Sequence, residues 1–264
     1  ALNLPIGENI AARVSGGFRK RDGYVIRAFD GLDLGNDNSR TLNGALRWEP
    51  TYNLKLSLRA DYTRRKENGA PFVFAGINEN APVPAIVSVA AGCPGATIPF
   101  APLAPGDPNF GAPFVPNIDD ARCANDFQEL GKYTNGGTAD VMSMSEVWGM
   151  SGTATLDLSD SLTLKSITAY RSTESRGIRD ADNTPFLIIT TDVGSQSDQF
   201  SQEVQLQYDS GPVSGILGAY YFDEDTNERA TVPLSFPPAP PVIGSILAGG
   251  PGTRDLQFSD LETR

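Results

Sequence analysis

The stretch LNGALRWEPTYNLKLSLRADY, residues 42–62, decides the fold expected of this chain. On either side of Pro50, apolar and polar residues alternate with a period of two, so each half has one apolar and one polar face as a β-strand. A tight turn at 50–53 makes the two halves an antiparallel hairpin. The apolar positions are Leu42, Gly44, Leu46 and Trp48, followed by Leu54, Leu56, Leu58, Ala60 and Tyr62.

The alternation recurs in segments at about 10–18, 41–49, 54–63, 147–158, 162–171, 200–208 and 213–222. Tight turns connect some neighbours, and long irregular segments at 19–40, 64–146, 172–199 and 223–264 connect or follow the others. Short connections at one end of the strands and long ones at the other are typical of a transmembrane β-barrel. We therefore expect an all-β, antiparallel barrel segment with short periplasmic turns and long extracellular loops, in which 1–264 is part of one domain. The segment 213–222 is apolar on both faces, so its faces stay unassigned.

Large aromatic residues fall at both ends of the expected strands. They are Trp48 and Tyr208 near the turns, and Phe18, Tyr62, Trp148, Tyr170 and Phe200 near the long loops. This placement predicts the two aromatic girdles of an outer-membrane barrel. The competing fold is a soluble β-sandwich or propeller, which needs short connections at both ends of its strands.

The composition of the chain disfavours several classes of function. A net charge of −11 disfavours nucleic acid as a partner, and the absence of histidine removes the commonest general base and metal ligand. No nucleophile, base or phosphate-loop pattern indicates an enzyme. No apolar run is long enough for a membrane helix, and no signal-like segment opens the chain, so we expect Ala1 to be a processed or internal start.

Three motifs resemble those of TonB-dependent outer-membrane receptors. They are Asn3-Leu4-Pro5-Ile6 with Ala12-Arg13 and Arg21-Asp22-Gly23-Tyr24, then the segment 162–171, and then the segment 200–207. Their order matches the early barrel of the family, and the similarity extends from about residue 3 to 225. The resemblance implies a large single-chain barrel around a plug, which takes up a scarce ligand (a siderophore, vitamin or glycan) with energy from an inner-membrane complex.

The chain departs from that pattern in having no plug, no coupling box and no closing aromatic strand. We therefore expect it to be the early barrel portion of a longer receptor that contacts its own plug, the remaining strands and, through the plug, the energy-coupling complex. A passive porin-like or surface-binding barrel is the alternative function. An upstream plug and coupling box would favour the receptor, whereas a signal peptide leading directly into the first strand would favour the porin.

Charged and amide residues on the polar faces are candidates for lining the lumen, either along the ligand path or in ion pairs. They are Arg13, Arg47, Glu49, Lys55, Arg59, Asp61, Glu203 and Gln205. Structural pairing is the expected role for most of them.

Two further sites are predicted in the loops. Cys93 and Cys123 share one extracellular loop, an oxidising setting in which a pair of cysteines usually forms a disulfide. Asp30, Asp33 and Asp37 offer oxygen ligands to Ca²⁺, although a solvated turn rich in Asp and Asn is the favoured interpretation. No other cofactor is expected.

Basic clusters follow three of the expected strands on the loop side. They are Arg19, Lys20 and Arg21, then Arg64, Arg65 and Lys66, then Arg171 with Arg176. At the level of the girdle, such residues can bind the phosphates of lipopolysaccharide in the outer leaflet. Pairing with acids in the lumen is the competing role. We expect Lys20→Glu with Arg65→Glu to weaken association with lipopolysaccharide.

Overall fold

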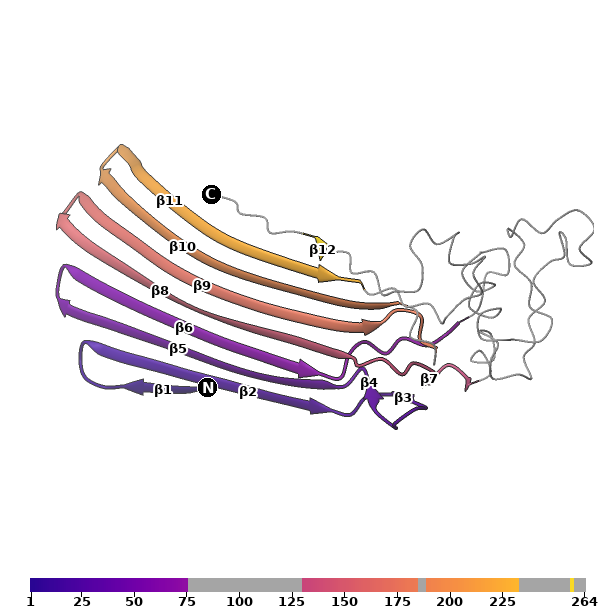
Figure 1. Cartoon of the computed structure of the whole chain (residues 1–264). Coiled ribbons are helices and arrows are strands. Elements are labelled where there is room, and N and C mark those ends of the chain that lie inside the picture. The colour runs from indigo at the N-terminus through magenta and orange to yellow at the C-terminus, as the bar shows by residue number, and fades with distance from the viewer. Residues whose placement is uncertain (76–129, 185–188, 233–256, 259–264) are drawn as a thin grey trace, which may run out of the picture.

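The structure is a computed structural model that describes residues 1–75, 130–184, 189–232 and 257–258. Most of these residues form one antiparallel sheet in which each long strand pairs with the next in sequence (Figure 1). The long strands are β2 (Ile10–Arg21), β5 (Asp37–Thr51), β6 (Leu54–Glu67), β8 (Met142–Ser159), β9 (Leu162–Asp180), β10 (Thr190–Ser210) and β11 (Val213–Thr231). The short strands β1 (Leu2–Pro5) and β12 (Gln257–Phe258) pair with the outer edges of β2 and β11.

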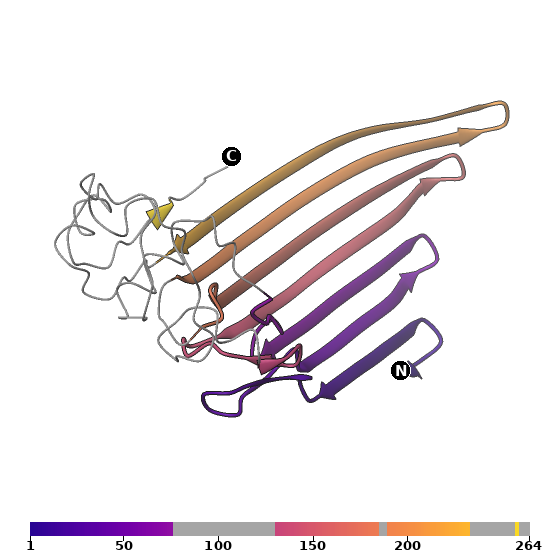
Figure 2. The same cartoon turned by 90° about the vertical axis from the view of Figure 1, so that its right-hand side faces the viewer.

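The connections alternate as the sequence predicts. Two-residue gaps separate β5 from β6, β8 from β9 and β10 from β11, and all three turns lie at one end of the sheet (Figures 1 and 2). Gly211 has a φ of 60° in the last of these turns, a conformation that glycine adopts without strain. At Pro50 the register of β5 and β6 shifts between Trp48 and Thr51, where the proline needs no ladder hydrogen bond.

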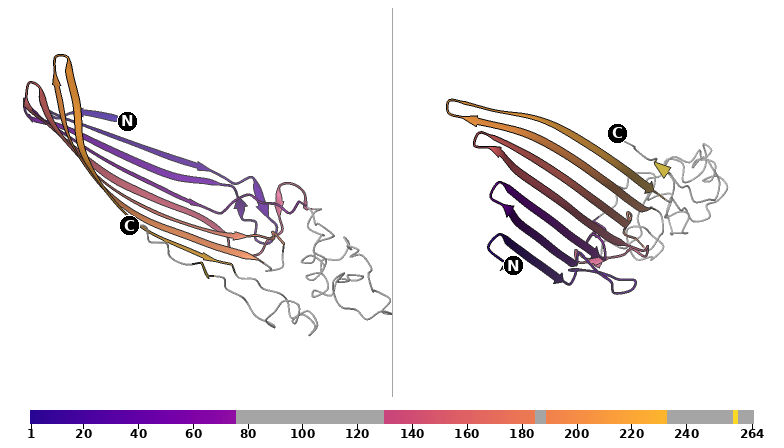
Figure 3. Two further views of the ribbon diagram at one scale, coloured as in Figure 1. Left: turned by 90° about the horizontal axis from the view of Figure 1, so that it is seen from above. Right: turned by 90° about the vertical axis from the view of Figure 1, so that its left-hand side faces the viewer.

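A second, three-stranded sheet lies at the opposite end, among the long connections. It consists of β4 (Asp33–Leu34), β3 (Val25–Arg27) and β7 (Thr134–Asn135), in that order. β3 pairs with β7 in parallel, although more than one hundred residues of chain separate them. The main sheet is broad, curved and twisted, with β1 and β11 near its opposite edges (Figure 3).

The strands are longer than their alternation predicts, and most of the added length is on the loop side, since the turn ends differ by at most two residues. β9 continues to Asp180 instead of ending at 171, and β10 begins at Thr190 instead of 200. The 21 residues of β10 span about 70 Å, whereas a tilted strand needs only about 9–11 residues to cross a bilayer. Beyond the girdle both faces of these strands are polar, so period-two hydrophobicity no longer marks them as strands.

Within the described part of the chain, no apolar layer packs on the sheet. Among the described residues the buried apolar side chains are Val25, Leu34 and Ala139, and none of the three belongs to the main sheet. Large apolar side chains on the sheet are exposed, for example Leu58 at 55% and Leu217 at 74%. A single-layer sheet with such a face needs an apolar surrounding to be stable.

No helix in the described part of the chain is long and apolar enough to cross a membrane. Cys93 and Cys123 lie outside the described residues, so the disulfide stays a prediction.

Candidate functional site

The register of the strands places all the predicted girdle residues on one face of the main sheet. Tyr62 lies opposite Trp148, and Tyr170 lies opposite Phe200. Trp48 lies opposite Leu56, and Leu46 lies opposite Leu58, so these four side chains are on the same face. We call this side the apolar face, since its central positions on β5, β6 and β8 are aliphatic or small.

The aromatic residues nearest the loops form a band in which two pairs of rings lie close together. The rings of Trp148 and Tyr170 lie 5.2 Å apart between centroids, and those of Phe200 and Tyr221 lie 6.3 Å apart. Tyr221 was not among the expected girdle residues, because the faces of its strand were unassigned. The register shows that Leu217, Ala219 and Tyr221 of β11 lie on the apolar face, and that Ile216, Tyr220 and Phe222 lie on the other.

The opposite side, which we call the polar face, carries the candidate lumen residues. Cross-strand partners connect them into rows: Arg13 with Ala45 and Arg59, Lys55 with Thr155, and Gln205 with Lys165. The structure therefore brings the predicted residues of β2, β5, β6 and β10 onto one surface. They are Arg13, Arg47, Glu49, Lys55, Arg59, Asp61, Glu203 and Gln205.

Ion pairing on the polar face is partial. Arg47 donates to Glu49 at 2.9 Å, and Arg171 Nη2 donates to Asp61 Oδ1 at 2.8 Å. Gly149 lies between Asp61 and Arg171 in the same row, and a Cβ there would come within 3.1 Å of the guanidinium. The glycine therefore lets Arg171 reach across β8. Within the described part of the chain, Arg13, Lys55 and Arg59 have no acidic partner.

A shallow hollow of about 170 Å³ lies beside the Asp61–Arg171 pair. The side chains of the polar face that line it include Asp61, Ser151, Arg171, Gln199 and Phe222. It combines a charge pair, hydroxyl and amide donors and one aromatic ring. Such a set can orient a polar ligand by hydrogen bonds.

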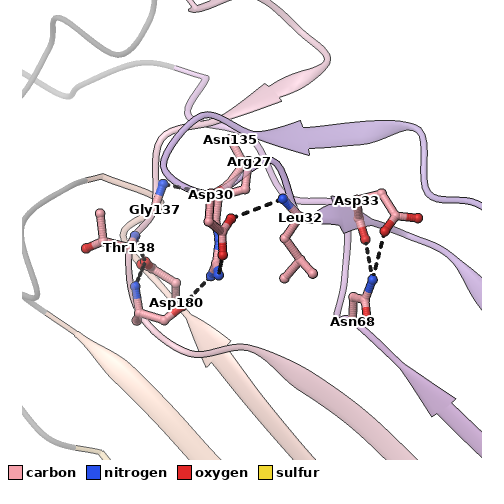
Figure 4. Close-up of polar contacts among 10 residues, drawn as sticks. Arg27, Asp30, Leu32, Asp33, Asn68, Asn135, Gly137, Thr138 and Asp180 are labelled. Atoms are coloured by element: carbon pink, nitrogen blue, oxygen red, sulfur yellow. Dashed lines mark hydrogen bonds and ion pairs between the residues drawn. The ribbon is translucent and has the colours of Figure 1, made fainter.

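At the loop end, the three-stranded sheet and its neighbours form a compact unit that we call the loop cap. It consists of residues 22–36, 68–72, 131–141 and 180–184 (Figure 4). Arg27 is 5% exposed, and its Nη1 donates to the carbonyl oxygen of Ala139 at 2.5 Å. Asn135, 3% exposed, donates to the carbonyl of Phe72 and to Asn183 Oδ1.

Asp180 connects several segments of the loop cap by hydrogen bonds. Its carboxylate is almost fully buried and accepts backbone N–H bonds from Thr138 at 3.1 Å, Ala139 at 3.2 Å and Asn183 at 2.9 Å. Gly137 passes directly beside this carboxylate, where a Cβ would collide with it. The end of β9 is therefore joined to the segment that leads into β8.

Arg27 and Asp30 form an ion pair in the loop cap. The guanidinium donates to both carboxylate oxygens, with Nε at 2.8 Å from Oδ1. These hydrogen bonds lower the pKa of Asp30 to about 2, while the same contact raises the pKa of Arg27.

The three aspartates proposed for calcium lie apart in the structure. Asp30 binds Arg27, Asp33 accepts from Gly23 and Asn68, and Asp37 pairs with Arg19 at 3.2 Å. The described residues contain no group of three or more His, Cys, Asp or Glu arranged around a common point. These carboxylates act here as hydrogen-bond acceptors that shape the first loop and its flanking strands.

The basic clusters were expected to follow the strands, and this expectation was wrong. They lie within β2, β6 and β9, because these strands continue to Arg21, Glu67 and Asp180. Because side chains alternate, each cluster is divided between the two faces. Arg19, Arg21, Arg65 and Arg171 lie on the polar face, while Lys20, Arg64, Lys66 and Arg176 lie on the apolar face. Lys20 and Arg65 are thus on opposite faces, and a joint substitution would not isolate either surface.

Several residues of the site were not anticipated from the sequence. Arg40 lies on the apolar face with its guanidinium over the ring of Phe18, 5.9 Å from the centroid. The alternation of Leu42, Gly44 and Leu46, extended two residues towards the N-terminus, would have placed Arg40 on this face. Arg27, Asn135 and Asp180 meet across distant segments, and the one local signal is the Asp and Asn content of 180–183.

The antiparallel meander, the exposed apolar face with aromatic residues at both ends, and the polar opposite face are those of a section of the wall of an outer-membrane β-barrel. Sequence comparison finds no matching family model and no matching curated protein. Comparison with solved structures does find the fold in outer-membrane receptors.

The ferric yersiniabactin uptake receptor FyuA from Yersinia pestis superposes with a TM-score of 0.52 at 15% identity, over 90% of this chain and 29% of the receptor. The siderophore receptor PiuA from Acinetobacter baumannii superposes with a TM-score of 0.51 at 13% identity, over 98% of this chain and 35% of the receptor. The chain thus spans about a third of the length of these receptors. It has the strand arrangement of the barrels of TonB-dependent outer-membrane receptors, as its motifs predicted.

Proposed function

We propose that this chain forms part of the barrel of a receptor that actively takes up a scarce ligand across the outer membrane. The observation that supports the proposal is the superposition of nearly the whole chain on two receptors whose names specify siderophores. A ferric siderophore is accordingly the first ligand class to test.

The two surfaces of the site suit such a role. The polar face offers three cations that have no acidic partner among the described residues (Arg13, Lys55 and Arg59) and the hollow beside Arg171, which suit an anionic or polar solute or the surface of a plug. The loop cap fixes the bases of the extracellular connections relative to the strands. In this proposal the plug and the inner-membrane coupling complex are partners, and the chain performs no bond chemistry.

The test measures uptake by cells that produce the full-length receptor. Labelled iron is supplied as a panel of ferric siderophores, in cells with and without the inner-membrane coupling complex. We expect saturable uptake of at least one complex, and we expect it to fall to background when the coupling complex is absent. Uptake that continues undiminished without that complex would instead identify a passive porin-like barrel.

A further inference from the structure

Four basic side chains gather on the apolar face of β2, β5 and β6, on the loop side of the aromatic band. We call them the outward basic patch, and they are Lys20, Arg40, Arg64 and Lys66. Arg40 lies opposite both Phe18 and Arg64 in adjacent strands, and Lys66 is two residues further along β6 on the same face. All four side chains belong to exposed residues.

The patch is not neutralised by the described part of the protein. Its single acidic contact is between Arg64 and Glu146, at 3.4 Å. Arg40 and Arg64 face each other directly, an arrangement of like charges that is unfavourable unless an anion lies between them. In a chain of net charge −11, this segregation of positive charge on one face indicates an anionic partner.

The position of the patch indicates what that partner is. The patch starts in the row of Phe18, at the loop-side edge of the aromatic girdle, and continues beyond it, which is the level of lipid headgroups. Nearer the turns, the same face has an apolar hollow of about 330 Å³ beside Leu58, Gly152 and Thr168. A molecule with phosphates at the headgroup level and fatty acyl chains below them matches both features.

The same level on β8 to β11 has a different character. Arg176 there is paired through both carboxylate oxygens with Asp192, at 3.0 and 2.6 Å. Arg229 lies on the same face across Gly194, and acidic side chains outnumber these two arginines: Glu146, Glu174, Asp192, Asp198, Asp223 and Asp225. An anionic headgroup would therefore be attracted to the β2–β6 side of this surface and not to the other.

We propose that the outward basic patch docks the phosphates of lipopolysaccharide, the phosphorylated glycolipid of the outer leaflet. Arg40 and Arg64 bind one phosphate group between them by charge-assisted hydrogen bonds, and Lys20 and Lys66 add charge on either side. Arg19, Arg21, Arg65 and Arg171 take no part, because they lie on the polar face. The proposal is independent of which solute the receptor transports.

Neighbouring residues provide a matched test. Lys66→Glu and Arg65→Glu change the same charge at adjacent exposed positions of β6, and they differ in the face that they affect. The full-length receptor and its variants are purified from outer membranes, and native mass spectrometry measures the fraction that retains lipopolysaccharide. Titration with lipid A micelles, phosphorylated or dephosphorylated, measures the role of the phosphates.

We expect Lys66→Glu to lower lipopolysaccharide retention several-fold, Lys20→Glu with Lys66→Glu to lower it further, and Arg65→Glu to leave it unchanged. The wild-type receptor should bind phosphorylated lipid A at least tenfold more tightly than the dephosphorylated form. Equal retention in all variants, equal loss in Arg65→Glu, or equal binding of the two lipid A forms would overturn the proposal. If a glutamate variant does not insert, Lys66→Gln and Arg65→Gln make the same comparison.

Discussion

Ser57 and Leu58 are neighbours in β6 whose side chains leave opposite faces of the sheet. Leu58 is opposite Leu46 and Gly152 on the apolar face, and Ser57 is opposite Arg47 and Thr153 on the polar face. Leu58→Arg should cost about 2–4 kcal/mol of folding stability near the bilayer midplane, whereas Ser57→Arg should cost little. Folding titrations of the full-length protein into lipid vesicles measure both. Equal losses would show that the faces are assigned wrongly.

Gly137 is a residue of the loop cap whose position leaves no room for a side chain. A methyl group there would meet the Asp180 carboxylate and lie 2.9 Å from Asn135 Oδ1. Gly137→Ala should therefore displace one of these buried groups from its hydrogen bonds, at a cost of about 1–3 kcal/mol.

Limited proteolysis of the segment 131–141 reports on the integrity of the loop cap. Gly177→Ala in β9 is the control, since nothing lies within 4 Å of a Cβ at that position. If the two variants were cleaved at the same rate, Gly137 would have no special role in packing.

At the scale of elements, the loop cap depends on an ion pair whose strength varies with pH. The pKa of Asp30 is about 2 in the folded protein, below its ordinary value of 3.8, because Arg27 donates to the charged form. A lowered pKa stabilises the folded loop cap above about pH 4, and this contribution is lost as the pH falls towards 2.

Comparison with Asp30→Asn isolates this contribution. We expect the backbone amides of 133–139 to exchange hydrogen faster in the variant than in the wild type at pH 5, and the difference to shrink as the pH falls to about 2, where half of the Asp30 side chains are protonated. A difference as large at pH 2 as at pH 5 would mean that the carboxylate charge is not its cause.

At the scale of the whole molecule, all the short turns lie at one end and the loop cap at the other. Cysteines introduced at Tyr52, in the turn between β5 and β6, and at Phe29, in the loop cap, test the orientation, since both positions are highly exposed. A membrane-impermeant maleimide should label Phe29→Cys on intact cells, and Tyr52→Cys only after the outer membrane is permeabilised. Both variants carry Cys93→Ser and Cys123→Ser to remove background. The reverse pattern would invert the proposed topology.

The sequence by itself determined the hairpins and the faces of β5, β6 and β8. In these strands apolar residues alternate with polar ones up to turns rich in Pro, Gly, Asn or Asp, and lipid on one side makes that alternation strict. The same rule predicted the girdle residues from Phe18 to Tyr208, because aromatic side chains mark where the apolar region ends.

Tertiary structure decided the strand ends, the faces of β11 and the contacts of the loop cap, because the alternation of apolar and polar residues does not encode them. The extension of β9 and β10 beyond the girdle depends on pairing with neighbouring strands, since both of their faces are polar there. The faces of β11 follow from its register with β10, and the division of the basic residues follows from strand continuity through residues 19–21 and 64–66. The loop cap joins Arg27 to Ala139, and Asp180 to Thr138, across distant parts of the chain. Contacts of that kind leave no periodic signal, because they form only when folding brings the separate loops to the same end of the sheet.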